Sequence, residues 1–188
     1  MPLLNSPSGY GSLTKALHWA IAALFALQYL GAWVMMRTTE TEPTFGAVQS
    51  TWYNWHKTLG LIALALAVVR LLNRRWGELP PWAPSLSPLE QQLIHKFEPL
   101  LYAAMFVMPL SGFLYTMAGG YGVLLFGVWA IPNPLGTSQG IATLARWTHV
   151  AAAFALLLPL GLHLGIVLGH HILARNGLIR RMLPGKPN

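Results

Sequence analysis

The sequence contains no cysteine and no aspartate, and few of its residues carry any charge. The lack of cysteine excludes disulfides, iron–sulfur clusters, thiolate zinc sites and prosthetic groups attached through paired cysteines. Charged residues make up 9% of the 188 residues and hydrophobic residues make up 54%, whereas soluble domains ordinarily carry about 25% charged residues. A soluble protein needs a polar surface that this sequence does not supply, so we predict that the chain lies in a membrane.

The acidic residues are few, and they avoid the apolar stretches. All five are glutamates in predicted loops or at the ends of apolar runs: Glu40, Glu42, Glu78, Glu90 and Glu98. This distribution argues against an acidic proton relay across the membrane. The net charge of +7 comes from basic residues that flank the apolar runs, which indicates membrane topology and not nucleic-acid binding.

Four apolar runs are long enough to cross a bilayer, which requires about 20 residues of helix. They cover residues 14–36, 55–72, 97–118 and 143–173. The first run continues to Met36 and is followed by Arg37 without a small-residue cleavage site, so we interpret it as a retained span. We therefore expect an all-α integral membrane four-helix bundle that forms a single transmembrane domain over residues 1–188.

The flanking basic residues predict the orientation of these spans. One side collects nine of the twelve: Lys15, Arg70, Arg74, Arg75, Lys96, Arg175, Arg180, Arg181 and Lys186. The other side holds Arg37, Lys57 and Arg146. Because the side richer in Lys and Arg faces the cytoplasm, both termini are predicted to be cytoplasmic. On the outer side, the apolar segment 119–140 is predicted to be an interfacial cap.

The histidines carry the strongest functional signal. Seven are present, at His18, His56, His95, His149, His163, His170 and His171. Polar residues within spans are rare and are often functional. His149 and His163 are fourteen residues apart in one predicted helix, so they differ by about 21 Å in height and lie within about 40° of the same face.

Each of these two histidines has a partner at a matching depth. His18 lies in the first turns of the first span and matches His163 on the cytoplasmic side. His56 opens the second span and matches His149 on the outer side. Two pairs at two depths suit two haem groups, each held by two imidazoles. Two alternatives are hydrogen bonds between helices and a bare metal ion, although a metal transporter usually adds carboxylates or thiolates, which these spans lack.

Several other residues are weaker candidates. The haem propionates need cations, which Arg70 or Lys15 could provide inside and Lys57, Arg37 or Arg146 could provide outside; snorkelling anchors would have the same pattern. His170 is the second candidate for the inner ligand. We expect it instead to snorkel with His171 among headgroups, and we expect His95 to have an interfacial role.

The ordered set of motifs resembles the bacterial cytochrome b561 family of four-helix dihaem membrane cytochromes. The motifs are residues 10–19 ending Leu-His-Trp, Trp55-His56-Lys57 with Gly60, Arg70-Leu71, His95, Tyr102, Pro109-Leu110-Ser111-Gly112, Phe126-Gly127, Ile131-Pro132, Trp147-Thr148-His149, Leu162-His163, His170-His171 and residues 178–184. The resemblance covers nearly the whole chain. It implies that His18, His56, His149 and His163 ligate two non-covalent haem b groups. It departs at Glu98, where some relatives carry a histidine.

The resemblance also implies electron transfer across the bacterial inner membrane, in contact with lipid and with no nucleic-acid partner. Family members are linked to superoxide oxidation with ubiquinone reduction, and others are haem subunits that exchange electrons with quinone. Our first hypothesis is a quinone-linked oxidoreductase that takes electrons from superoxide. The alternatives are a non-catalytic haem subunit docked to a dehydrogenase or hydrogenase as redox partner protein, and a haem-free membrane scaffold or carrier.

Overall fold

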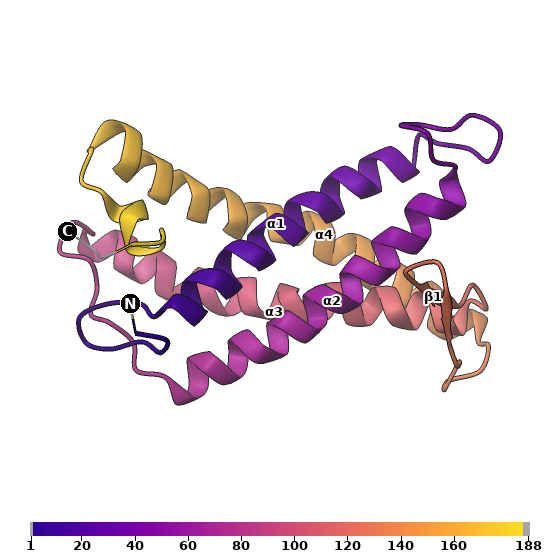
Figure 1. Cartoon of the computed structure of the whole chain (residues 1–188), viewed down its shortest axis with the longest axis horizontal. Helices are drawn as coiled ribbons and strands as arrows, with labels where there is room; N and C mark the ends of the chain where they lie inside the picture. The colour runs from indigo at the N-terminus through magenta and orange to yellow at the C-terminus, as the bar shows by residue number, and fades with distance from the viewer. Residues whose placement is uncertain (1, 186–188) are drawn as a thin grey trace. The chain divides into compact units, whose positions relative to one another are not determined.

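The computed structural model describes residues 2–185, and four long helices dominate it (Figure 1). They are α1 (Ser12–Met35), α2 (Gln49–Trp76), α3 (Pro88–Ala118) and α4 (Gln139–Leu168). Each is long and apolar enough to cross a membrane, and each overlaps one of the spans expected from the sequence. The expected all-α class with four spanning helices is therefore confirmed. Lys186, which we counted among the basic residues of the cytoplasmic side, lies outside the described residues.

The helices extend beyond the apolar runs because their first turns are polar. The clearest case is α3, which begins nine residues before the predicted span. Ser87 and Glu90 form a capping box there: the Glu90 carboxylate accepts a hydrogen bond from the Ser87 amide at 2.8 Å, and the Glu90 amide donates to Ser87 Oγ at 3.3 Å. These bonds satisfy backbone donors that the start of a helix leaves unpaired.

The chain divides into two compact units, and all four helices contribute a segment to each. The first unit contains the residues up to Ala20, Leu66–Ala104 and the residues from Phe154 onward. The second contains Ile21–Ala65 and Met105–Ala153. The first unit therefore holds His18 and His163, and the second holds His56 and His149.

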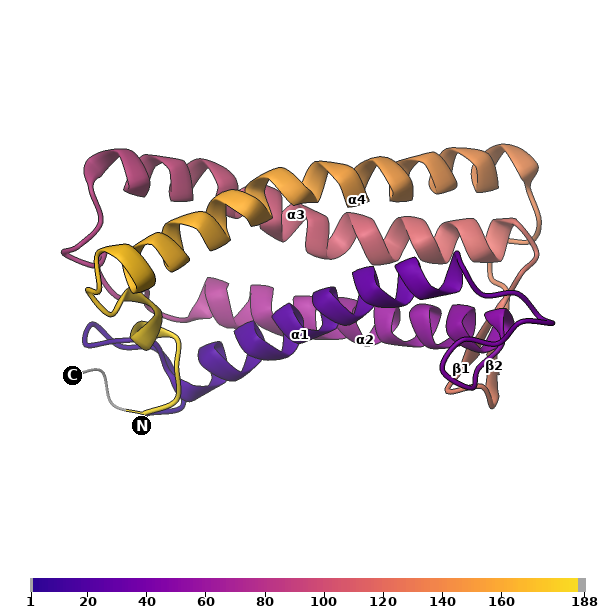
Figure 2. The same ribbon diagram turned by 90° about the horizontal axis from the view of Figure 1, so that it is seen from above.

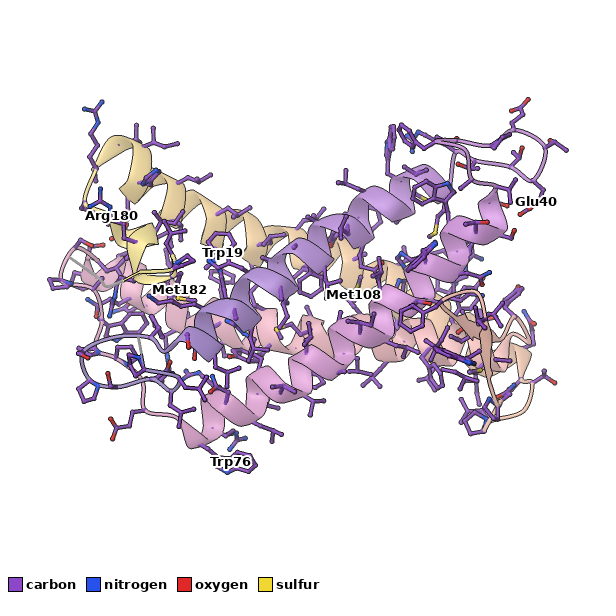
Figure 3. All side chains as sticks on the ribbon, viewed as in Figure 1. Trp19, Glu40, Trp76, Met108, Arg180 and Met182 are labelled. Carbon is purple, nitrogen blue, oxygen red and sulfur yellow. The ribbon has the colours of Figure 1, made fainter. Side chains whose placement is uncertain are left out.

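In the first unit, polar contacts fix the beginning of α1. Asn5 Oδ1 accepts hydrogen bonds from the Gly11 amide at 2.9 Å and from Thr14 Oγ1 at 2.7 Å. The C-terminal segment reaches the same helix, where Trp19 Nε1 donates to the Met182 carbonyl at 2.7 Å (Figure 3). These contacts lie within about two turns of His18, so they restrain the part of α1 that carries it.

After α4, the chain continues as a π-helix, η1 (Gly169–Leu173), and a short 3-10 helix, η2 (Leu178–Arg181). π-Helical turns are rare and often occur at functional sites. This one carries His170, which is buried, and the contacts of that residue are described below.

The second unit contains a small β-hairpin within the segment that we expected to be an interfacial cap. Strands β1 (Val123–Leu125) and β2 (Trp129–Ile131) pair antiparallel, and the hairpin lies beside the first turns of α2 (Figure 2). The Phe126 amide donates to Thr58 Oγ1 at 3.1 Å, and Lys57 Nζ donates to the Gly122 carbonyl at 3.0 Å. The hairpin therefore anchors to the helical turn that carries His56.

Candidate functional site

The first histidine pair joins α1 and α4 within the first unit. The ring centroids of His18 and His163 are 6.1 Å apart, with an angle of 61° between the ring planes. Both side chains are half-buried. The structure thus brings together the two histidines that matching depth predicted for one side of the membrane.

The second pair joins α2 and α4 within the second unit. The ring centroids of His56 and His149 are also 6.1 Å apart, at an interplanar angle of 80°. Both residues are half-buried. The two pairs are therefore alike in spacing, although they draw their rings from different helical segments.

The spacing of 6.1 Å in each pair distinguishes between two kinds of contact. An imidazole nitrogen binds a metal at about 2.0–2.1 Å and lies about 1 Å from its ring centre, so two imidazoles in line on one metal have centroids about 6 Å apart. Two imidazoles joined by a direct hydrogen bond of about 2.9 Å would have centroids about 5 Å apart. The observed spacing fits a metal atom between the rings.

The donor set distinguishes a haem iron from a bare metal ion. In the described part of the chain, no group of three or more His, Cys, Asp or Glu side chains is placed to hold a metal ion. A bare ion bound by a pair of imidazoles would have an incomplete set of protein ligands. Haem supplies its own equatorial nitrogens and takes protein ligands only on its axis, so a pair of facing imidazoles fits haem.

His149 rests on a surface of α3 that the sequence did not lead us to include in the site. His149 Nδ1 lies 2.8 Å from the carbonyl oxygen of Met108 and 3.4 Å from Ser111 Oγ. A Cβ atom added at Gly112 would lie 3.1 Å from His149 Cε1 and Nδ1. We call Met108, Ser111 and Gly112 the His149 seat. The available signal was the Pro109–Gly112 motif, since α3 supplies none of the four paired histidines.

His56 is positioned differently. Gln28 Nε2 donates to the His56 backbone carbonyl at 3.0 Å, and a Cβ at Gly60 would lie 3.1 Å from that same Nε2 atom. His56 Nδ1 and Gln28 Oε1 are both buried, and neither has a hydrogen-bond partner among the described residues. Gln28 therefore supports the backbone of His56, a role that the sequence did not indicate because one glutamine in an apolar helix forms no motif.

Arg70 is the cation best placed to serve the first pair. Its Nη1 atom is buried without a hydrogen-bond partner in the described structure, and its guanidinium carbon lies 5.7 Å from the centre of the Tyr102 ring. It belongs to the same compact unit as His18 and His163. Lys15, the alternative, donates instead to the Leu183 and Gly185 carbonyls at 2.9 and 3.3 Å.

The three cations that we expected on the outer side make contacts of their own. Besides the bond from Lys57 to Gly122, Arg37 donates to the Trp33 carbonyl at 3.1 Å and lies 4.4 Å from the centre of that indole ring. Arg146 lies 5.8 Å from the centre of the Trp147 ring. Arginine stacked on tryptophan near a helix end is typical of interfacial anchoring, so these contacts do not single out one of the three as a propionate partner.

His170 does not extend outward as the snorkelling that we expected would require. It is 8% exposed, and its Nε2 atom lies 2.8 Å from Glu90 Oε1 while Nδ1 contacts Asn176 Nδ2. Because both ring nitrogens are engaged, neither is available for iron, which removes the second candidate for the inner ligand. His171 and His95 are exposed, in agreement with peripheral roles.

The fold and the histidine pairs together define a class: a multi-pass helical membrane protein with two pairs of neighbouring imidazoles on its helices. Comparison with known proteins identifies the group within that class. The family model described as prokaryotic cytochrome b561 matches residues 9–185. The chain therefore belongs to the prokaryotic cytochrome b561 family of membrane electron-transfer proteins, which implies haem b as cofactor.

Two relatives match the chain over nearly its whole length. It is 26% identical to cytochrome b561 homolog 2 of Escherichia coli (strain K12) over 188 residues, covering 97% of this chain and 95% of the relative. It is 24% identical to a probable superoxide oxidase, CybB, of Yersinia pestis over 177 residues, covering 94% of this chain and 97% of the relative. The family resemblance seen in the sequence is thus confirmed.

Proposed function

We propose that this protein is a dihaem b cytochrome that transfers electrons across the bacterial inner membrane to or from quinone. In this proposal, His18 and His163 would hold one haem, and His56 and His149 would hold the other. The observation that carries it is the spacing of 6.1 Å in both pairs. When bound, haem b supplies a reversible one-electron couple that no amino-acid side chain of this chain provides.

The protein's own residues then have defined tasks. With two imidazoles holding each haem, the iron would have no protein-free position for a substrate, so substrates would not bind at iron. The surrounding apolar side chains exclude water, and the ligands and nearby charges set the reduction potential. Both termini lie in the cytoplasm under this proposal, because nine of the twelve basic residues flank that side. The whole chain acts as a single transmembrane domain, since each helix contributes to both units.

The first candidate reaction is the oxidation of superoxide coupled to quinone reduction. Two superoxide anions each lose one electron and become dioxygen, and one quinone takes the two electrons and two protons to become quinol. Lys57, Arg37 and Arg146 would attract the anion on the outer side. Support comes from the family and from the name of the Yersinia pestis relative.

Purified protein tests this function directly. We expect a reduced-minus-oxidised spectrum of low-spin haem b, two haems per chain, and quinone reduction driven by superoxide and abolished by superoxide dismutase. Two haems without turnover would favour the alternative of a non-catalytic subunit. A chain that folds but binds no haem when haem is supplied would overturn the proposal in favour of a scaffold.

Arg70 gives a second prediction, because its buried Nη1 atom has no hydrogen-bond partner among the described residues, and a buried charged group needs a partner. We propose that it binds a propionate of the haem held by His18 and His163. Hydrogen bonds to charged groups contribute about 1.5–3 kcal/mol, so Arg70→Gln should weaken retention of this haem by roughly 10- to 150-fold. Haem transfer to apomyoglobin measures that loss.

The controls for Arg70 use the same helix. Arg75 is exposed, and Arg75→Gln should retain both haems as the wild type does. Arg70→Lys keeps the charge but loses the planar guanidinium, which can donate two parallel hydrogen bonds to a carboxylate. Its haem retention should therefore lie between those of wild type and Arg70→Gln. Equal retention in Arg70→Gln and Arg75→Gln would contradict the assignment of Arg70.

A further inference from the structure

The contacts of His149 determine which of its ring nitrogens carries a proton. Nδ1 lies 2.8 Å from the carbonyl oxygen of Met108. A carbonyl oxygen can only accept a hydrogen bond, so Nδ1 must be the donor. The neutral imidazole then has its free electron pair on Nε2. A metal ligand requires a free electron pair of this kind, so the contact with α3 selects the tautomer of His149 that can bind iron.

The seat also provides the space and a second acceptor. Gly112 leaves room for the ring, because a Cβ there would lie 3.1 Å from two of its atoms. Ser111 is 4% exposed and its Oγ lies 2.5 Å from the Val107 carbonyl. The serine proton therefore points to that carbonyl, and the oxygen, 3.4 Å from His149 Nδ1, is left as an acceptor.

The other three paired histidines lack such a seat. His56 Nδ1 is buried without a partner among the described residues. No hydrogen bond within the described chain holds a ring nitrogen of His18 or His163. The two pairs share one spacing but differ in how firmly their imidazoles are oriented, and the difference is concentrated at His149.

We propose that the His149 seat is a positioning and tuning site, which orients His149 toward iron and lowers the reduction potential of the haem held by His56 and His149. The inference rests on the proposed function, because it requires haem at this pair. The physical reason is that a hydrogen bond donated by Nδ1 raises the basicity of Nε2, the nitrogen that would bind iron. A more basic ligand stabilises the oxidised iron, which favours passing an electron on over retaining it.

The test is a redox titration of the full-length haem-loaded protein in detergent, in wild type and in Gly112→Ala and Ser111→Ala variants. Loss of an outer-shell partner commonly costs about 10- to 100-fold in metal affinity or activity, and we expect an effect of similar size on the equilibrium between oxidised and reduced haem. For one electron, a tenfold change in the equilibrium constant is about 59 mV. We expect Gly112→Ala to raise the potential of one spectral component by at least this amount, and the other component to keep its wild-type potential.

Ser111→Ala introduces no clash, so it tests the seat even if Gly112→Ala does not assemble. It should shift the same component in the same direction by a smaller amount, and Ser111→Thr, which keeps the hydroxyl, should restore the wild-type value. Gly165→Ala is the matched control, since a Cβ there meets nothing within 4 Å. His56→Ala protein identifies the component, because it should lack the one that shifts.

Three results would overturn the proposed role of the His149 seat. They are unchanged potentials in both variants, a shift in the component that His56→Ala retains, and equal shifts in Gly112→Ala and Gly165→Ala. All three still require two haems in the wild type, so they leave the proposed function standing. Wild-type protein without haem would instead remove the proposed function itself.

Discussion

We expect His149→Ala to lose one haem and to keep the other. The substitution removes one of two axial ligands at the second pair, and the cavity left by the ring offers no replacement donor among the described histidines. His18 and His163 belong to the other compact unit, so their haem should stay bound. The measurement is haem per chain in purified protein, together with the reduced-minus-oxidised spectrum, in which one component should disappear.

The pairing itself gives a sharper form of this prediction. His56→Ala should remove the same spectral component as His149→Ala, and the double variant should lose no more than either single one, because residues that act as a unit are not additive. His18→Ala and His163→Ala should both remove the other component. His171→Ala is the control, since this residue is exposed and should leave both components intact.

Two outcomes would contradict the assignment. The first is loss of different components in His56→Ala and His149→Ala. The second is equal loss of both haems in every single variant while helix content and thermal stability stay at the wild-type level. Either would show that the spacing of 6.1 Å within each pair does not correspond to two independent sites.

The four spans could be predicted because hydrocarbon requires long apolar helices and the sequence has four suitable runs. The residues at which the helices begin were harder to predict from the sequence. α2 begins at Gln49 and α3 at Pro88, with polar first turns outside any apolar run. The hairpin from Val123 to Ile131 was missed for a different reason. Its segment is apolar without alternation, and its anchors at Lys57 and Thr58 lie far away in the sequence.

The histidine pairs followed from helix geometry alone, since the rise and the angle per residue fix which residues share a depth and a face. The His149 seat did not follow, because it depends on a backbone carbonyl and on the absence of a side chain at Gly112. Neither a backbone carbonyl nor a glycine can be recognised from the sequence as the support of a metal ligand. The snorkelling predicted for His170 was wrong, because its ring is buried against Glu90. The sequence did not indicate this contact, since the two residues are 80 positions apart.

His163→Ala should separate electron entry from electron delivery. If superoxide is oxidised on the outer side, the pair of His56 and His149 should still accept electrons in this variant. If quinone takes its electrons from the haem held by His18 and His163, delivery to quinone should fail, because that haem is lost with its second ligand. Loss of a residue that only supports a metal ligand lowers activity by up to about 100-fold. Loss of the ligand itself should have a larger effect, so we expect quinone reduction to fall by more than about 100-fold.

The measurement for His163→Ala combines two readouts in oriented vesicles: the rate of quinone reduction driven by external superoxide, and the rate at which the remaining spectral component becomes reduced. The rate of quinone reduction should fall sharply, while the rate at which the remaining spectral component becomes reduced should stay near the wild-type rate. His171→Ala, eight residues further along the chain, should alter neither. Wild-type turnover in His163→Ala would place the quinone beside the His56–His149 pair and would reduce the proposed two-site path to a single site. The variant therefore tests whether the electron must cross the membrane through both pairs, which the spacing of the rings alone does not require.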